Sequence, residues 1–543
     1  MSSRHWPTLV SKRLPSQIHS AEEVFVEKGK PESYSGFMCG HWSCADQHCG
    51  ESPCSCTISR VYSLSACVSS RPIHEMRHKK EPVMGTIVPI RKLTRITSKL
   101  LIVVMVIAQF GVARAGHRGG RNSAVGGISI DVSGVVGPPS RDGLKRHLTA
   151  LNKEIKAASD DMVMPVKMRI LSLRGLAASC EDAMKNRFGR LPDEVQFLAG
   201  LQRIQYVFVD PEANDILIAG PAEGWRIDDR ANVVGVTTDR PVLLLDDLLV
   251  ALRQVHAART EGISCSIDPT EEGYRNLQKV LDAQRSQGSV NRQVLEPAMK
   301  RAFGPQVVTI KGVPATSHFA RVLVAADYRM KRIAMKIDQA PVKGLPSYLD
   351  LMKTSRSGGD VNPRWWLACN YEPLLAGEDG LSWELKGPGV KAMTEDDFVA
   401  ADGTVTGTGR KSAAAQRWAD MMTEKYDDLS GGDVIFAELR NLMDLCVVAA
   451  LIEKNHLWDK AGLSVPILTE QNSPLKLRKS NPAKLIPPEV SFLKKGKSWI
   501  VTASGGIQVE SWQVADNVET SGELADLRQQ AVTPRTTESI WWQ

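Results

Sequence analysis

After residue 115, the 543-residue sequence lacks the short motifs that build the commonest catalytic sites. This part of the chain has no G-x-x-x-x-G-K-[ST] loop, no H-E-x-x-H helix and no G-x-S-x-G turn, which excludes from it the nucleotide, zinc-protease and serine-hydrolase sites that depend on them. The histidines after residue 115 are far apart and show no metal-ligand spacing; they are His117, His147, His256, His318 and His456. We therefore predict no cofactor and no metal in this part of the chain.

An excess of one charge is also missing once the N-terminal segment is set aside. The whole chain has 68 Lys and Arg against 61 Asp and Glu, but residues 1–115 hold 15 basic and 8 acidic side chains, which leaves 53 of each sign. Only residues 476–497 are locally basic, and no aromatic stacking platform interleaves them. The composition favours a mixed, solvated surface, and we predict no nucleic-acid partner.

The apolar run from Leu100 to Ala113 is shorter than the about 20 residues that a transmembrane helix needs. It follows a positive flank at residues 91–99 and ends in Ala113-Arg114-Ala115, a small-x-small sequence before Gly116. This pattern is typical of a secretory signal peptide. We predict a signal peptide over residues 84–115 and a secreted or periplasmic protein with no stable membrane span after cleavage. The other interpretation is an uncleaved anchor with residues 1–99 in the cytoplasm.

Residues 1–83 precede a leader of ordinary length that begins at Met84, and we interpret them as an over-extended start or a disordered segment. Most cysteines of the chain lie here, and with His41 and His48 they raise the alternative of a zinc site. The cysteines lack the paired C-x2-C spacing of structural zinc sites, which argues against zinc. The segment also has no apolar periodicity that could form a core, so burial cannot offset the entropy that ordering it would cost. These cysteines are Cys39, Cys44, Cys49, Cys54, Cys56 and Cys67.

Four cysteines follow the leader, and an oxidising compartment allows three pairings of them. Cys369 alternates with apolar residues on one face of an expected strand, and Cys446 shares a helical face with Leu442 and Ala450. Both are expected in the core. Cys180 to Cys265 is the one candidate disulfide that remains.

The periodicity predicts interleaved helices and strands without a regular β-α-β rhythm, which indicates an α+β domain with mixed and antiparallel sheets over residues 128–460, as one unit or two subdomains. A hairpin is expected over residues 204–221. Two strong helices, about 412–429 and 434–455, are separated by Ser-Gly-Gly and are expected to end the domain as an antiparallel pair. We interpret residues 116–127 as a flexible linker, 461–515 as a basic linker with a short β segment, and 516–543 as a flexible tail.

Ser317 and His318 stand side by side at an expected helix start, with Asp327 and Lys331 further along. Neighbouring residues of a helix do not face each other, so this pair cannot act as nucleophile and base without help from elsewhere. The favoured interpretation is structural. Thr316 or Ser317 caps the helix, and Asp327 pairs with Lys331 at i+4.

Acidic residues cluster in two short stretches and form the least weak candidate for catalysis. Paired carboxylates serve glycoside hydrolysis, and aromatic side chains on the adjoining strands would offer a carbohydrate platform. Acidic residues in such stretches more commonly stabilise turns or cap helices, and Thr394 to Asp397 has the pattern of a helix start. The acids are Glu378, Asp379, Glu384, Glu395, Asp396 and Asp397, and the aromatics are Trp365, Trp366, Tyr371 and Trp383.

Long blocks of the sequence are similar to a bacterial family of unknown function. They include GISCSIDPTEEG (262–273), HFARVLVAADYRMKRI (318–333), RWWLACNYEPLL (364–375) and LRNLMDLCVVAALI (439–452). In this order they resemble the domain-of-unknown-function family numbered 1598, over about residues 191–457. The resemblance implies an exported protein with an α+β region and no assigned activity, so no catalytic residue is carried over.

Two functions follow as hypotheses. The first is a non-enzymatic structural or interaction module of the cell envelope, whose partners are other, unknown envelope components. The alternative is an envelope glycan or peptide hydrolase that uses the paired carboxylates around Trp383.

The leader makes a prediction about the native protein. Intact-mass and N-terminal analysis should find a chain that begins at Gly116, because the small-x-small site is placed for signal-peptide cleavage. A native chain that begins at Met1 would contradict both the trimming and the predicted compartment.

Overall fold

The computed structural model describes residues 127–287, 291–354, 362–400, 402–495, 498–501, 504–533 and 541–543. The predicted signal peptide with its cleavage residues Ala113, Ala115 and Gly116 lies outside this range, as do the segment before it and nearly all of the predicted linker. The described chain combines many helices with antiparallel and parallel strand pairs. This is the α+β class that the periodicity predicted.

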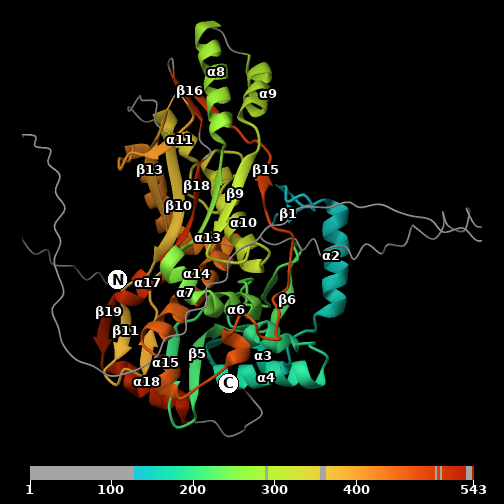
Figure 1. Cartoon of the computed structure of the whole chain (residues 1–543), viewed down its shortest axis with the longest axis vertical. Coiled ribbons are helices and arrows are strands. Elements are labelled where there is room, and N and C mark those ends of the chain that lie inside the picture. The colour runs from blue at the N-terminus through green and yellow to red at the C-terminus, as the bar shows by residue number, and fades with distance from the viewer. Residues whose placement is uncertain are drawn as a thin grey trace, which may run out of the picture. The chain divides into compact units, whose positions relative to one another are not determined.

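Two sheets organise the fold, and Figure 1 shows the larger one in the upper half. Its seven strands, in spatial order, are β14 (Val405–Gly407), β13 (Gly389–Val399), β10 (Asn362–Asn370), β18 (Gly505–Val509), β8 (Ile263–Asp268), β9 (Gln306–Lys311) and β15 (Leu485–Ile486). The smaller sheet contains β19 (Val518–Ser521), β11 (Leu374–Gly377), β12 (Ser382–Glu384), β4 (Tyr206–Asp210), β5 (Asp215–Ala222) and β3 (Val166–Ser172). The predicted hairpin over residues 204–221 is β4 and β5.

Three short antiparallel pairs lie outside these sheets: β1 (Ser129–Ile130) with β2 (Val136–Gly137), β6 (Trp225–Ile227) with β7 (Val233–Gly235), and β16 (Phe492–Lys495) with β17 (Ser498–Val501). The helices before residue 350 are α2 (Arg141–Glu154), α3 (Asp160–Val163), α4 (Leu173–Asn186), α5 (Asp193–Gln196), the 3-10 turn η1 (Leu198–Gly200), α6 (Leu245–Arg253), α7 (Val255–Glu261), α8 (Glu271–Gln287), α9 (Arg292–Phe303), α10 (His318–Ala334) and α11 (Tyr348–Thr354). Those that follow are α12 (Ala413–Glu424), α13 (Tyr426–Gly432), α14 (Val434–Lys454), α15 (Leu457–Ala461), α16 (Pro466–Thr469), α17 (Ser511–Asp516) and α18 (Glu523–Val532).

Helix α14 is the central element of the fold. Seventeen of its 21 residues are buried, because α6, α10, α13 and α17 pack around it. The sequence predicted one helical face with Leu442, Cys446 and Ala450 in the core, and these residues are buried as expected. The other faces are buried too. Figure 1 shows α14 between the two sheets.

The helix expected at residues 412–429 is divided at Lys425 into α12 and α13. Helix α12 lies on strand β13, and the short α13 contacts α14. Ser-Gly-Gly, expected as the break, forms the last turn of α13, and Asp433 starts the next helix instead.

The helix start expected at Thr394 is a strand. Thr394 to Asp397 belong to β13, which pairs with β10 in an unbroken register from Asn362 opposite Asp397 to Asn370 opposite Gly389. A capping pattern stabilises a helix by about 1 kcal/mol, whereas this ladder satisfies the backbone groups of nine residue pairs. The tertiary pairing therefore overrides the local signal.

The C-terminal part of the chain differs most from its prediction. Strand β18 belongs to the segment expected as a basic linker with a short β segment, but it lies inside the large sheet, parallel to β10 and antiparallel to β8. Residues 516–543, expected as a flexible tail, add β19 to the edge of the small sheet and place α18 against β11, β12 and β4. Trp541 is buried as well. These C-terminal residues are ordered by contacts with residues far away in the sequence. The amino-acid composition of the segment alone does not reveal such contacts.

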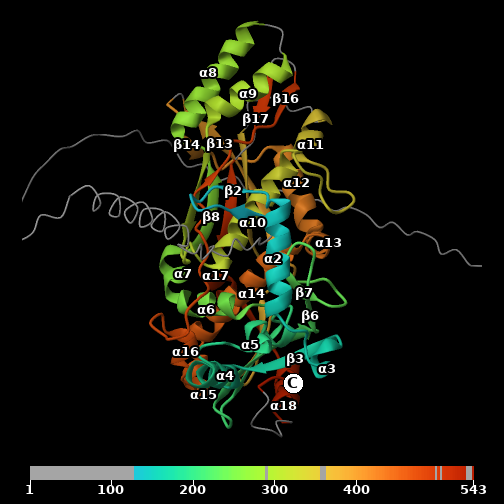
Figure 2. The same cartoon turned by 90° about the vertical axis from the view of Figure 1, so that its right-hand side faces the viewer.

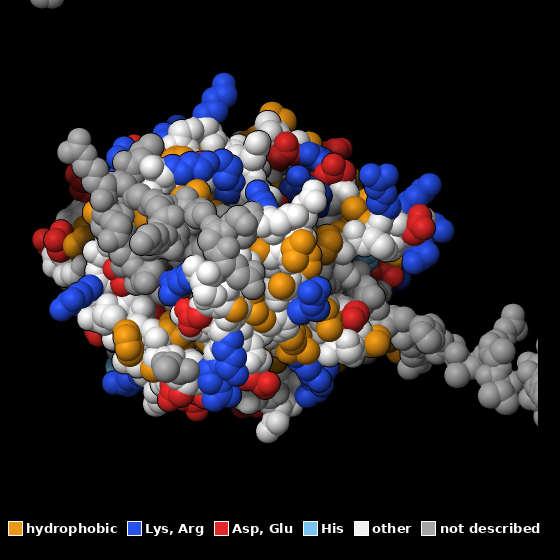
Figure 3. All heavy atoms as spheres, turned by 90° about the horizontal axis from the view of Figure 1, so that it is seen from above, with side chains coloured by type: hydrophobic (Ala, Val, Ile, Leu, Met, Phe, Trp, Pro, Cys, Tyr) orange, Lys and Arg blue, Asp and Glu red, His pale blue; other side chains and the backbone are white. Residues whose placement is uncertain are grey.

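The surface is mixed in charge. On the face shown in Figure 3, basic and acidic side chains are interspersed with apolar ones. In the described ranges, we find no helix that is both long and apolar enough to cross a membrane.

The position of β18 predicts a sensitive glycine. A Cβ at Gly505 would lie 2.2 Å from the Trp365 carbonyl oxygen, whereas a Cβ at Gly431 in α13 would meet no atom within 4 Å. Gly505→Ala should lower the free energy of unfolding by about 1–3 kcal/mol, because β18 must move away from β10. Gly431→Ala, the matched control, should leave it unchanged or raise it slightly. Urea unfolding compares the two, and equal effects would contradict the strand placement.

Candidate functional site

A cavity of about 190 Å³ lies where α2, α6, α10 and α14 approach one another. This is far more than the about 10–15 Å³ that one water needs. Its walls are largely apolar, and one end is lined by charged and amide side chains. The apolar residues include Leu151, Ile155, Phe197, Val233, Leu245 and Leu445, and the polar ones are His147, Gln196, Asn232, Asp246, Asp247, His318, Arg321, Glu438, Asn441, Arg478, Lys479 and Ser480.

Helix α2 forms the outer wall of the cavity. It begins after Ser140, whose hydroxyl accepts a hydrogen bond from the backbone N–H of Gly143. Leu151 of α2 and Ile155, the residue directly after the end of α2, line the cavity. No residue within α2 is fully buried. Figures 1 and 2 place α2 along the outside of the helices that it covers. Because α2 is only partly buried, the edge of the cavity beside this helix is a suitable entrance for a ligand.

Two helix N-termini meet at the polar end. Asp247 lies in the first turn of α6, where the helix dipole favours a carboxylate. His318 is the first residue of α10, and its Nδ1 lies 2.9 Å from Asp247 Oδ2. Burial disfavours the charged imidazole, but Asp247 and Glu438 outweigh burial and raise the pKa of His318. Among the described residues, Asp247 is the hydrogen-bond partner of this ring.

Helix α14 contributes the other polar residues. Glu438 and Asn441 are three residues apart and therefore lie on one face. Burial raises the pKa of Glu438 to about 7, while His318 acts in the opposite direction. Asn441 is 4% exposed and donates from Nδ2 to the Pro241 carbonyl at 3.2 Å. Burial also lowers the pKa of Arg321 to about 10, and Glu438 partly opposes this shift.

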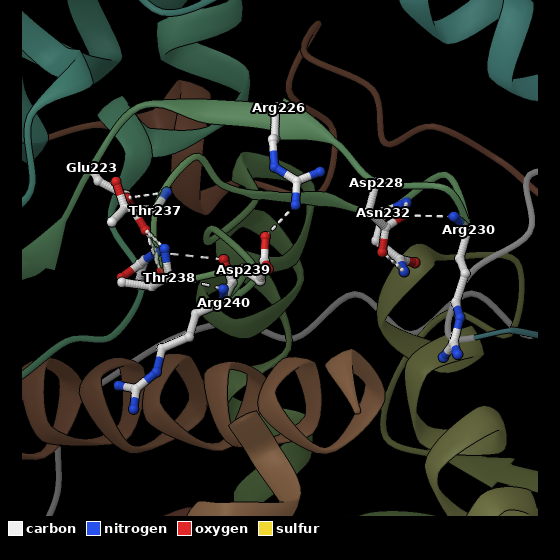
Figure 4. A network of polar contacts seen from close by, with 10 residues as sticks. Glu223, Arg226, Asp228, Arg230, Asn232, Thr237, Thr238, Asp239 and Arg240 are labelled. Carbon is white, nitrogen blue, oxygen red and sulfur yellow. Dashed lines mark hydrogen bonds and ion pairs between the residues drawn. The ribbon is translucent and has the colours of Figure 1, made fainter. Parts of the chain in front are cut away.

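The wall opposite α14 is the segment between β5 and α6, and a polar network fixes its conformation (Figure 4). The Glu223 carboxylate accepts from the backbone N–H groups of Thr237 at 2.8 Å and Thr238 at 3.0 Å. It also accepts from Gln202 Nε2 at 2.8 Å and from the Thr238 hydroxyl. Gly235 is required here, because a Cβ would lie 2.0 Å from Glu223 Oε1.

A second part of this network holds the turn that lines the cavity. Asp228 accepts from the backbone N–H groups of Arg230 at 2.9 Å and Asn232 at 2.7 Å, and from Asn232 Nδ2 at 2.8 Å. Figure 4 shows the ion pair of Arg226 and Asp239 between the two parts. Asn232 and its neighbours are thereby positioned without help from a ligand.

The locally basic segment predicted as a linker closes the remaining side. Arg478 Nε lies 3.8 Å from Asp246 Oδ2, and Ser480 donates from its backbone N–H and its hydroxyl to the Thr316 carbonyl. Arg478 and Lys479 are exposed at the rim. Burial raises the pKa of Asp246, although Arg478 partly opposes it.

The structural interpretation of the Ser317 region is confirmed, but it was incomplete. The Ser317 hydroxyl caps α10 by accepting from Ala320 N–H at 3.1 Å, and Lys331 Nζ lies 3.1 Å from Asp327 Oδ2. Ser317 also donates to the Pro314 carbonyl, so it is not aligned with His318 as a nucleophile. The ring instead faces an acid from another helix, which the sequence did not indicate.

The acidic clusters have structural partners. Glu384 interacts with Tyr206 and Lys386, Asp379 accepts from Leu381 N–H in a turn and pairs with Arg528, and Glu395 pairs with Arg364. Asp396 and Asp397 are buried in β13. Trp365 and Trp383 are 1% and 2% exposed, so neither presents a face to a sugar. None of these predicted acids and aromatic residues is among the described residues that line the cavity, and the carboxylates that do line it are Asp246, Asp247 and Glu438.

The four described cysteines are buried free thiols, and Cys180 does not form the candidate bridge with Cys265. Cys180 lies in α4, which packs on β3 and β5 of the small sheet, whereas Cys265 lies in β8 of the large one. Cys369 and Cys446 are core residues, as predicted. Within the described chain, no group of three or more His, Cys, Asp and Glu residues is arranged to hold a metal ion.

The arrangement has two chemical capabilities. Buried acceptors and charged groups at one end of an apolar cavity can orient a small ligand. A carboxyl group with a pKa of about 7 beside a histidine and aspartate pair can also donate and accept protons near neutral pH. Sequence reasoning missed Asp247, Glu438 and Asn441. The available signal was the presence of polar residues at i and i+3 within the apolar helix at 434–454.

Comparisons with known proteins identify one segment. Residues 265–348 match the model of a family described as "Protein of unknown function (DUF1598)", which confirms the predicted resemblance in this segment. The match runs from β8 to the start of α11 and includes His318 and Arg321 of the cavity. No curated protein matches the chain, and no solved structure matches it.

The raised pKa of Glu438 predicts a pH-dependent stability. An unfolded glutamate ionises near pH 4.3, so the folded state loses stability as the pH rises from about 4.3 to about 7, where Glu438 itself ionises. Glu438→Gln removes this loss. Its free energy of unfolding relative to the native protein should rise by about 1–3 kcal/mol between pH 4.5 and pH 8, measured by urea unfolding.

Glu453→Gln is the matched control, because Glu453 lies on the same helix and is half-buried beside His256. Urea unfolding of this variant at the same two pH values gives the effect of the same substitution at a position of α14 outside the cavity. A Glu438→Gln effect that is constant over this range would contradict the buried, raised carboxyl group.

Proposed function

We propose that the protein is an exported, non-enzymatic interaction module of the bacterial cell envelope that binds a small molecule in the α2–α6–α10–α14 cavity. One observation carries the binding proposal: apolar walls converge on a small set of polar groups with shifted pKa values. Binding sites for small molecules typically have this composition. The charged groups fix the orientation of the ligand, and the apolar walls supply most of its affinity.

The walls support binding because they hold the cavity open. The segment from Glu223 to Arg240 is fixed by its own hydrogen bonds, and α14 is fixed by its burial. The ligand would therefore enter a preformed site and would not have to order these walls, which reduces the entropic cost of binding. Of the four helices around the cavity, α2 is the one without a buried residue, so entry beside Leu151 disturbs the core least.

Export rests on the leader, which has a positive flank, a short apolar run and the Ala113-Arg114-Ala115 site. An exported module of this kind would meet its ligand and its partners in the envelope. The partners are proposed to be other envelope components.

A second candidate is an envelope glycan or peptide hydrolase that uses paired carboxylates. The observation in its favour is the Glu438 carboxyl, with its pKa of about 7, beside the His318 and Asp247 pair in the same cavity. These groups have the protonation behaviour that general acid and base catalysis needs. The acids around Trp383 are engaged in turns and ion pairs, so the cavity is the better location for this activity.

A panel of small amphiphiles tests the binding proposal. Hexanol, hexanamide, hexane-1,2-diol, hexanoate and hexylammonium share an apolar chain and differ in head group. At least one should raise the free energy of unfolding of the native protein, by about 2.7 kcal/mol at 100 times its Kd. Leu151→Trp fills the cavity and should abolish the effect, as measured by thermal and urea unfolding.

Asn152→Trp is the matched control, since Asn152 is an exposed neighbour on α2. It should behave as the native protein does. If no member of the panel stabilises the native chain, or if Leu151→Trp retains the effect, the cavity is not the binding site. Release of hexanoate from hexanamide that depends on Glu438 would favour the hydrolase.

A further inference from the structure

Two buried acceptor atoms on α14 indicate the kind of head group that the cavity accepts. Glu438 Oε2 and Asn441 Oδ1 are both buried, and neither has a hydrogen-bond partner among the described residues. Both residues line the cavity. The hydrogen bond from Asn441 Nδ2 to Pro241 O fixes the orientation of the amide, so Oδ1 is the atom left over.

Buried acceptors without donors are rare in folded proteins, because each has lost its hydration. Two in one cavity, on one face of one helix, call for a molecule that donates to both. Side chains three residues apart on a helix have Cβ atoms about 5–6 Å apart. A head group with two N–H or O–H donors can span such a pair.

The charges of the cavity indicate that this head group is neutral. At the inner end, Asp247 and an ionised Glu438 are balanced by His318 and Arg321, and His147 of α2 also lines the cavity. At the rim, Asp246 is paired with Arg478, and Lys479 is exposed to solvent. An ammonium group would meet the two inner cations, and a carboxylate would meet the two inner acids. A charged head group therefore gains little here to offset its desolvation.

We infer that the cavity binds an uncharged amphiphile whose head group carries two hydrogen-bond donors, directed at Glu438 Oε2 and Asn441 Oδ1. The apolar part of the molecule lies against Leu151, Phe197 and Val233. Primary carboxamides and vicinal diols both have this donor pair. The inference rests on the proposed binding function and specifies its ligand class.

The test compares head groups on the native protein by isothermal titration calorimetry at pH 8, above the pKa of about 7 of Glu438, so that its carboxylate oxygens accept hydrogen bonds. Hexanamide or hexane-1,2-diol should bind at least about tenfold more tightly than hexanoate and hexylammonium, and the better of the two identifies the donor chemistry. Asn441→Leu should weaken that ligand about tenfold and change the affinity of the charged probes little. Asn152→Leu, at an exposed position of α2, should change neither.

The outcomes separate this inference from the proposed function. If a charged probe binds most tightly and Leu151→Trp abolishes its binding, the cavity is a binding site and the donor-pair inference is overturned. If no probe binds, both are overturned. Should Asn441→Leu fail to fold, as judged by circular dichroism, the head-group order on the native protein decides the inference without a variant.

Discussion

Helix α14 carries charged and amide side chains into the interior, and the buried charge of Asp444 is paired with residues beside both sheets. Asp444 has no exposure and accepts from Arg203 Nε and Nη2, each at 2.9 Å, and from the Tyr371 hydroxyl at 2.6 Å. Arg203 precedes β4 of the small sheet, and Tyr371 follows β10 of the large one. A buried charge is stable only when it is paired, so this contact fixes both sheets against the helix. The cavity exists at one face of the same helix.

The cavity is therefore a consequence of how α14 is held. Its face with Glu438 and Asn441 meets the N-termini of α6 and α10, where Asp247 and His318 interact with each other. The wall made by residues 223–240 is stabilised independently by Glu223 and Asp228. These walls, the segment with Arg478 and the less buried helix α2 together enclose a preformed site. This is the arrangement that ligand binding with little reorganisation requires.

The candidate site could be predicted from the sequence only in part. His318 and Ser317 were visible because they stand at a recognisable helix start, and the capping role of Ser317 follows from local chemistry alone. The partner of His318 is 71 residues away, and Glu438 lies on a helix still further along the chain. Nothing in the local pattern distinguishes an acid that faces a cavity from one that faces water. The acids near Trp383 were the more conspicuous cluster, yet they form turns and ion pairs.

The sequence by itself determined the local elements: the 204–221 hairpin, the capped start of α10, the apolar helix at 434–454 and the resemblance of the central segment to its family. These depend on side-chain periodicity, turns and caps, which act between residues close in the chain. Only the tertiary structure decided that Thr394 to Asp397 form a strand, that β18 enters the middle of a sheet, and that polar residues from three helices share one cavity. In each case the deciding contacts join residues far apart in sequence, and their combined free energy exceeds the about 1 kcal/mol of a local capping preference.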